Sequence, residues 1–178
     1  MSSAGYFKNS QLRNFNYEIS ASNLKVLEEI RVFELSNILK KPYEQVNEFE
    51  GLLLRGIHWF ARSQTQVDVE NEFLNLTTCL EVFFTSKGGD PISSSIAEGV
   101  ALILGKELTE RKRLKRRVKE LYGFRSNISH GGHSPILAKD IVDLKSIAMS
   151  LLVKMVEWSK DFSSRKDLVD WLEDQKLS

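Results

Sequence analysis

Residues 141–158 read IVDLKSIAMSLLVKMVEW, and their apolar side chains recur every three or four positions. Such steps place the side chains on one stripe of a helix, because an α-helix has 3.6 residues per turn. No comparable stretch of the chain alternates with a period of two, so strands are not expected. The three stretches with helical spacing carry Val46, Phe49, Leu53, Ile57 and Phe60; Val69, Phe73, Leu76, Leu80 and Phe84; and Ile141, Leu144, Ala148, Leu151, Met155 and Trp158. The spacing predicts an all-α protein.

Proline and glycine punctuate this pattern and set the expected helix boundaries. Ser95 and Glu98 match a capping box at one boundary, and Ser163, with Asp161 as the alternative, is the expected N-cap of the last helix. The short connections favour antiparallel neighbours, so we expect an antiparallel bundle of about six to seven helices. After a tail that ends near Ala21, the expected helices are 23–40, 44–63, 67–86, 94–105, 107–128, 138–160 and 164–175.

The composition is that of an ordinary globular protein. The chain has 178 residues, of which 42% are hydrophobic and 28% charged, and its net charge is only +1. Attraction to a nucleic acid must therefore come from local clustering of charge. With Cys79 as the single cysteine, no intrachain disulfide can form, and we expect this side chain to serve packing alone. The N-terminus does not resemble a signal peptide, and no apolar run is long enough to cross a bilayer, so a cytoplasmic protein with no membrane partner is expected.

One expected helix is strongly basic. Seven of the nine residues from Arg111 to Lys119 are Lys or Arg, while an apolar stripe continues through the same stretch. A solvated helix surface explains this pattern, and so does contact with the phosphates of a polyanion. The second interpretation gains from position, because the basic helix leads directly into RSNISH, residues 125–130. The candidate RNA-binding residues are Lys112, Arg113, Arg116, Arg117 and Lys119.

The end of this helix, LYGFRSNISHGG at residues 121–132, combines a cap with two chemically useful side chains. Gly131 or Gly132 can end the helix in the left-handed conformation, which explains the glycines. Arg125 and His130 lie about 140° apart on a straight helix, so they meet only in a cleft at its end or in one shared with a second copy. Arginine binds phosphate, and histidine moves protons near neutral pH. The pair suits metal-independent cleavage of RNA by attack of the ribose 2′-OH.

The stretch from Arg125 to His130 fits the R-x4–6-H motif of HEPN domains. LYGFRSNISHGG, together with IHWFARSQTQVDVENEFLNLTTCLEVFF upstream, resembles the branch related to the ApeA abortive-infection proteins. The resemblance covers roughly residues 50–157. It implies a helical bundle of the HEPN type that forms a homodimer with a composite ribonuclease site, without a cofactor. Arg125 and His130 would be the catalytic pair, and the domain would span 22–160, with a tail at 1–21 and a C-terminal helix at 161–178 packing on the bundle or the dimer.

Three further residues are candidates for supporting roles. Many HEPN proteins carry Asn, Asp or His directly after the arginine, where this chain has Ser126, so Asn127 is an alternative source of that polar group. The resemblance also places Glu81 near the site, although a surface carboxylate on the helix is an equal alternative.

The remaining candidates are weaker. Asp68 and His133 are expected to have no essential role, and His58 is expected in or near the core. The histidines and the cysteine do not have the short spacing of a zinc site, and Gly88 with Gly89 does not begin a P-loop.

Three functions are compatible with these observations. The first is a metal-independent endoribonuclease of a toxin or antiviral-defence system, held in check by an antitoxin or a sensor domain. The second is a non-catalytic HEPN-like module that dimerises and binds RNA or a protein. The third is a plain helical interaction domain whose basic face is only solvated.

Overall fold

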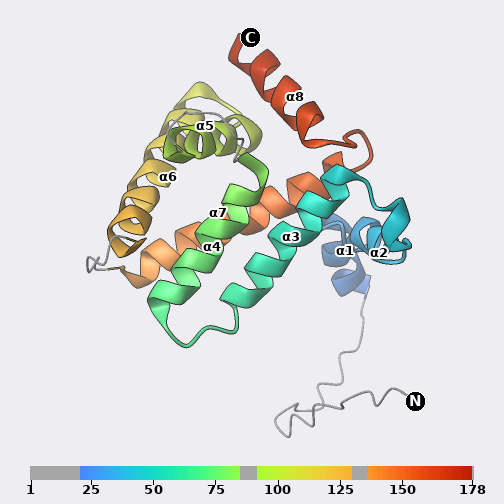
Figure 1. The fold of residues 1–178 in the computed structure, drawn as a ribbon, viewed down its shortest axis with the longest axis horizontal. Helices are drawn as coiled ribbons and strands as arrows, with labels where there is room; N and C mark the ends of the chain where they lie inside the picture. Colours follow the sequence, from blue (N-terminus) through green and yellow to red (C-terminus); the bar gives the residue numbers. More distant parts are fainter. Residues whose placement is uncertain (1–20, 85–91, 130–135, 178) are drawn as a thin grey trace, which may run out of the picture.

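The structure is a computed structural model that describes residues 21–84, 92–129 and 136–177. In these ranges the chain forms eight α-helices, one short 3-10 helix and no strand (Figure 1). The α-helices are α1 (Ala21–Glu29), α2 (Val32–Leu39), α3 (Glu48–Ser63), α4 (Val69–Phe84), α5 (Ile92–Leu104), α6 (Leu108–Ser129), α7 (Ala138–Trp158) and α8 (Arg165–Leu177), and the 3-10 helix is η1 (Tyr43–Gln45). The all-α prediction is confirmed, whereas the tail 1–20 lies outside the described residues.

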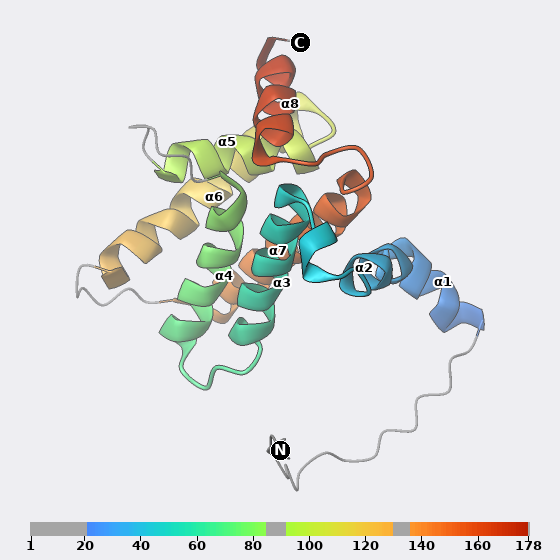
Figure 2. The same ribbon diagram turned by 45° about the vertical axis from the view of Figure 1, so that its right-hand side comes forward.

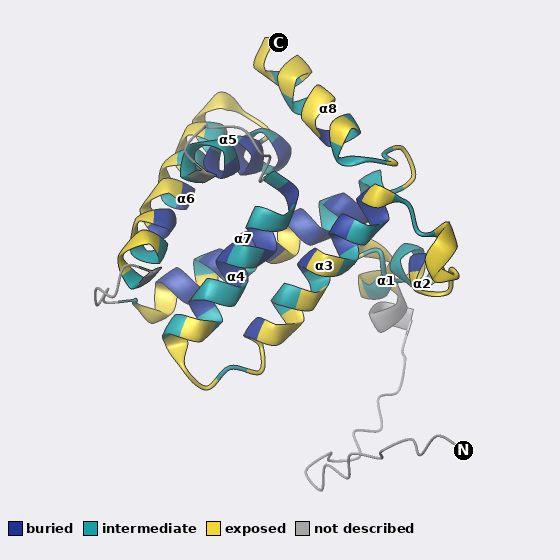
Figure 3. Ribbon diagram, viewed as in Figure 1, coloured by how far each residue is buried: buried dark blue, intermediate teal, exposed yellow. Residues whose placement is uncertain are grey.

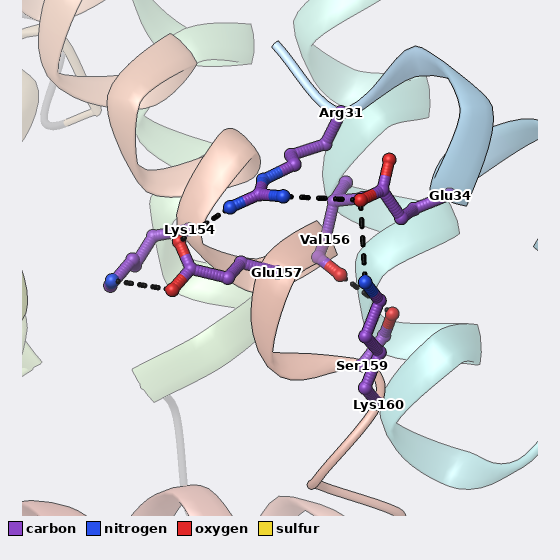
Figure 4. A network of polar contacts seen from close by, with 7 residues as sticks. All are labelled: Arg31, Glu34, Lys154, Val156, Glu157, Ser159 and Lys160. Carbon is purple, nitrogen blue, oxygen red and sulfur yellow. Dashed lines mark hydrogen bonds and ion pairs between the residues drawn. The ribbon is translucent and has the colours of Figure 1, made fainter. Parts of the chain in front are cut away.

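The single helix expected at 23–40 is wrong, because the chain breaks it into α1 and α2. Arg31 adopts a left-handed backbone conformation with φ 59° and ψ 32°, which a continuous helix cannot contain. Its guanidinium contacts Glu34 at 3.2 Å and Glu157 of α7 at 3.9 Å. Glu34 also accepts a hydrogen bond from Lys160 at 3.3 Å, so the network joins the start of α2 to the end of α7 (Figure 4).

The core forms where α3, α4 and α7 pack together. In Figures 1 and 2, α3 and α4 lie side by side and α7 crosses behind them, with α5 and α6 on one side and α1 and α2 on the other. The predicted apolar stripes supply the buried residues, which include Phe49 and Leu53, Phe73, Leu76 and Leu80, and Leu144, Leu151 and Met155. The spacing of apolar residues therefore identified the core faces of these three helices.

Two helix starts differ from the predictions. Asn47 Oδ1 accepts from the backbone N–H of Glu50 at 2.9 Å, and Glu50 Oε2 accepts from that of Asn47 at 3.2 Å. This capping box starts α3 at Glu48 rather than at 44. The box expected from Ser95 and Glu98 is wrong, because α5 begins at Ile92 and Ser95 lies inside it.

The last helix packs against the rest of the bundle. Leu168 is fully buried, and the rings of Trp171 and Trp158 lie 4.5 Å apart. The residue directly before α8 is Ser164, whose Oγ accepts from the backbone N–H of Asp167 at 3.4 Å. Ser163, the expected N-cap, instead donates through its backbone N–H to Asp167 Oδ2 at 2.7 Å. Among the described helices, not one combines the length and the hydropathy that a membrane span requires.

Candidate functional site

Arg125 of α6 and Glu81 of α4 form the central contact of the candidate site. Arg125 Nε lies 2.5 Å from Glu81 Oε1, and Nη2 donates a hydrogen bond to Oε2 at 3.0 Å. The arginine side chain keeps 33% of its surface exposed, against 15% for the glutamate. Only the Nη2–Oε2 contact is a hydrogen bond, whereas Nε and Oε1 meet as a close ion pair without hydrogen-bond geometry. The two residues, 44 positions apart in the chain, are thus brought together as one polar pair.

Tyr122 positions this pair from one turn earlier on α6. Its hydroxyl donates a hydrogen bond to the carbonyl of Thr77 at 3.1 Å, and Thr77 lies one turn before Glu81 on α4. Burial, and then the neighbouring charge of Glu81, raise the pKa of Tyr122 well above its usual value, so the phenol remains a donor. Nothing in the sequence around Tyr122 indicated this polar role.

The surroundings of Glu81 disfavour the ionised form of its carboxyl group. Burial raises the pKa of Glu81, and the opposing effects of the Arg125 charge and of the hydrogen bond from Arg125 do not fully offset it. Ionisation of Glu81 therefore costs free energy, and the attraction of Arg125 is the main interaction that offsets this cost.

The C-terminal end of α4 is held by α8. Arg165 donates to the carbonyl of Val82 at 2.9 Å and to that of Phe83 at 3.2 Å, the two residues that follow Glu81. These carbonyls lie in the last turn of α4. The sequence did not identify this contact, because Arg165 lies 84 positions from Glu81 and nothing in its surroundings distinguishes it from a surface arginine.

The other predicted members of the site lie elsewhere or cannot be placed. Ser126 and Asn127 are exposed, on the side of α6 turned away from Glu81, so the structure does not bring them to the Arg125–Glu81 pair. His130 lies outside the described residues and follows Ser129, the last residue of α6. Gly131, Gly132 and His133 lie outside them as well, as do Gly88 and Gly89.

Arg117, a predicted RNA-binding residue, is already engaged by acidic side chains. Its Nη2 contacts Asp140 at 2.5 Å and Asp143 at 2.8 Å, both on α7, and its Nη1 contacts Glu120 at 3.3 Å. Asp140 is buried, and its Oδ2 accepts from the backbone N–H of Leu137 at 2.8 Å. Burial raises the pKa of Asp140, but the hydrogen bonds from Arg117 and Leu137 outweigh it and leave the pKa below its usual value. Arg117 therefore fastens α6 to α7.

The other basic residues of α6 fall into two groups: some are bound by acidic or carbonyl groups of the protein, and the rest are exposed. Arg111 donates to the carbonyl of Gly105 at 3.1 Å, and Lys115 contacts Glu98 of α5 at 2.7 Å. Figure 3 shows α6 at the edge of the molecule, with exposed positions along it. In contrast to Arg111 and Lys115, four predicted RNA-binding residues of α6 are exposed, and none forms an ion pair with any described residue. These four are Lys112, Arg113, Arg116 and Lys119.

The structure also places three other residues that the sequence singled out, namely His58, Asp68 and Cys79. His58 is exposed, and the expectation of a core position is wrong because α3 buries the opposite face, at Phe49, Leu53 and Gly56. Asp68 precedes α4 and accepts from the backbone N–H of Asn71 at 2.9 Å, as a helix cap does. Cys79 is buried, which confirms its packing role, and burial raises its pKa to about 12.

Searches for related proteins add no identification to this geometry. Neither the protein-family models, nor the curated proteins, nor the solved structures gave a match to the chain. In the described part of the chain, no three His, Cys, Asp or Glu side chains gather closely enough to hold a metal ion.

Proposed function

We propose that the protein is a metal-independent endoribonuclease of a toxin or antiviral-defence system, with a HEPN-type bundle. The observation that carries the proposal is the ion pair of Arg125 with Glu81, which holds a side chain that is 33% exposed in the last two turns of α6. His130 follows this helix directly in the sequence, and unpaired cations line the same helix upstream. Groups for phosphate binding and for attraction of a polyanion thus lie on α6, and the group for proton transfer follows this helix in the sequence.

In the proposed reaction, Arg125 holds the scissile phosphate and stabilises the negative charge that develops on it. Glu81 contacts the guanidinium through Nε and Nη2, while Nη1 has no partner among the described residues and is available to a phosphate oxygen. A guanidinium fixed before substrate binds loses little freedom in the transition state, which favours catalysis. Glu81 is accordingly a positioning residue rather than a group that contacts RNA.

His130 takes the proton of the ribose 2′-OH, whose oxygen then attacks the adjacent phosphorus. The P–O5′ bond breaks as the P–O2′ bond forms, the 5′-oxygen takes a proton from solvent water as it leaves, and His130 returns its proton to solvent, so the products are a 2′,3′-cyclic phosphate and a 5′-OH. DNA is not cleaved, because it carries no 2′-OH. In a homodimer, two copies of this motif would share one composite site, as the HEPN resemblance implies.

The experiment that tests the proposal incubates end-labelled single-stranded RNA with the wild type and with His130→Ala, both in EDTA. The wild type is expected to cleave and to leave 2′,3′-cyclic phosphate ends, whereas His130→Ala should retain its helical circular dichroism and lose cleavage. Arg125→Lys keeps the charge but not the fork, and should also lose most of the activity. Loss of wild-type cleavage in EDTA, or equal cleavage of the matching DNA, would contradict the mechanism.

A second candidate is a non-catalytic module that dimerises and binds RNA. The observation in its favour is the same ion pair, since compensating the charge of a partly buried glutamate is by itself a sufficient structural role for Arg125. This candidate predicts that the wild type binds RNA without cutting it, and that Arg125→Ala changes stability without changing any nuclease activity.

A further inference from the structure

The outer side of α6 carries a continuous stripe of exposed residues. At 3.6 residues per turn, positions 112, 116, 119 and 123 lie within about 60° of one another around the helix axis, and 126 and 127 extend the stripe. All six are exposed, and we call them the α6 outer stripe: Lys112, Arg116, Lys119, Gly123, Ser126 and Asn127. From the first to the last residue it spans about 22 Å, at 1.5 Å per residue.

The positive charge of this stripe is not neutralised within the described protein. Lys112, Arg116 and Lys119 form no ion pair there, whereas Glu120, the acid at the edge of the stripe, is paired with Arg117 at 3.3 Å. The stripe is a ridge between two hollows. Arg116 lines a groove of about 380 Å³ towards α7, and Lys119 lines a cleft of about 300 Å³ towards α5 and α8.

Gly123 is the feature of the stripe that the fold does not explain. It lies inside α6, where glycine destabilises a helix relative to alanine. A Cβ added there would meet nothing within 4 Å, so neither a neighbouring helix nor the backbone requires glycine at this position. A glycine that packing does not require, exposed beside three unpaired cations, allows another molecule to approach the helix backbone closely.

We propose that the α6 outer stripe binds the sugar–phosphate backbone of single-stranded RNA, with Gly123 at the point of closest approach. The charge decides between an RNA and a second copy of the chain, because two such stripes facing each other would bring at least six unpaired cations together. The strand runs along α6 towards Ser126 and Asn127, which follow Arg125 in the sequence but lie on another side of the helix. The choice of RNA as the polyanion rests on the proposed function, whereas the location of the binding surface does not.

Binding is measured by fluorescence anisotropy with a 2′-O-methyl oligonucleotide, which cannot undergo attack by a 2′-OH, at several salt concentrations. Each phosphate contact on a single strand contributes about 0.7 to the slope of log affinity against log salt. Replacing Lys112, Arg116 and Lys119 together by alanine should therefore reduce the slope by about 2. The matched control replaces Lys25, Lys40 and Arg55, which are exposed on other parts of the chain, and should leave affinity nearly unchanged.

Gly123→Ala gives a test in which stability and binding move in opposite directions. Removing the helix glycine should raise the melting temperature by about 2–4 °C. The added methyl group should keep the strand away from the helix and weaken binding by about three- to tenfold. Gly51→Ala in α3 is the matched control, since a Cβ there also meets nothing within 4 Å, and it should raise the melting temperature without affecting binding.

The outcomes separate this proposal from the proposed function. An unchanged salt slope in the triple variant, or unchanged affinity in Gly123→Ala, would overturn the stripe as the binding surface even if the protein cleaves RNA. A reduced slope and weakened binding in a protein that never cleaves RNA would support the stripe and contradict the ribonuclease. If Gly123→Ala instead converts a dimer to a monomer in sedimentation, the surface belongs to a second copy and the proposal is wrong.

Discussion

The inward and outward faces of α6 carry the same kinds of basic residue but differ in what surrounds them. Facing inward, Arg117 contacts three acids and Arg125 contacts Glu81, so each guanidinium is held by the neighbouring helices. Facing outward, Lys112, Arg116 and Lys119 are exposed and unpaired within the described chain. Adjacent arginines in one basic run can therefore serve opposite purposes, one fastening helices together and the other remaining available to a ligand. Only the partners across the helix interface distinguish them.

The two faces of α6 should differ most in how much their arginines contribute to the free energy of unfolding. Arg117→Ala leaves buried Asp140 without its cationic partner, and should lower the free energy of unfolding by about 3 kcal/mol. Arg116→Ala, one position earlier, removes an exposed side chain and should change it by less than about 0.5 kcal/mol. Urea unfolding of both variants measures the difference. Equal losses of unfolding free energy in the two variants would show that Arg117 stabilises the fold no more than Arg116 does.

A smaller effect should come from the pair at the candidate site. Arg125→Ala and Glu81→Ala each leave one member of a half-buried pair unmatched, so the double variant should lose less stability than the sum of the single losses. The coupling free energy from the double-mutant cycle should be about 1–2 kcal/mol. The same cycle applied to Lys166 and Asp170, an exposed ion pair on α8, provides the control and should give less than about 0.5 kcal/mol. A coupling at the Arg125–Glu81 pair as small as that of the control would remove the argument that Glu81 fixes the arginine.

The smallest effect concerns the pH dependence of stability. Burial raises the pKa of Glu81 above its usual 4.5, so its carboxyl group adds stability at low pH, and this contribution is lost as pH rises through the raised value. Glu81→Gln cannot ionise and lacks this dependence. The stability of the wild type relative to Glu81→Gln should therefore decline as pH rises from about 4.5 towards neutrality. Thermal unfolding of both proteins across this interval measures the trend, and a growing advantage of the wild type would mean that Arg125 outweighs burial.

The sequence predicted those parts of the molecule that depend on local spacing. The three apolar stripes correctly identified the buried faces of α3, α4 and α7, because helical geometry alone determines which residues share a face. The break at Arg31 was missed, because the local spacing of apolar residues reveals neither its left-handed backbone conformation nor its contact with Glu157, 126 residues away. For the same reason the sequence grouped Arg117 with Arg116, although only the fold brings Asp140 and Asp143 to one of them.

The candidate site was predicted in part. The resemblance placed Glu81 near Arg125, and the structure brings the two side chains into contact. The resemblance gave no reason to expect that Tyr122 and Arg165 would fasten the helices that carry this pair. Both side chains donate hydrogen bonds to backbone carbonyls that are distant in sequence. The catalytic role of Arg125 and His130 remains a prediction.

The central claim is that α6 binds RNA along one face and presents catalytic groups at its end. It is tested most directly by the rate of RNA cleavage in a single turnover, measured in EDTA against enzyme concentration. We expect His130→Ala to abolish the maximal rate, and the joint replacement of Lys112, Arg116 and Lys119 by alanine to move the concentration of half-maximal rate upward by tenfold or more. The account is contradicted if the wild type does not cleave RNA, or if both variants lower the maximal rate alike.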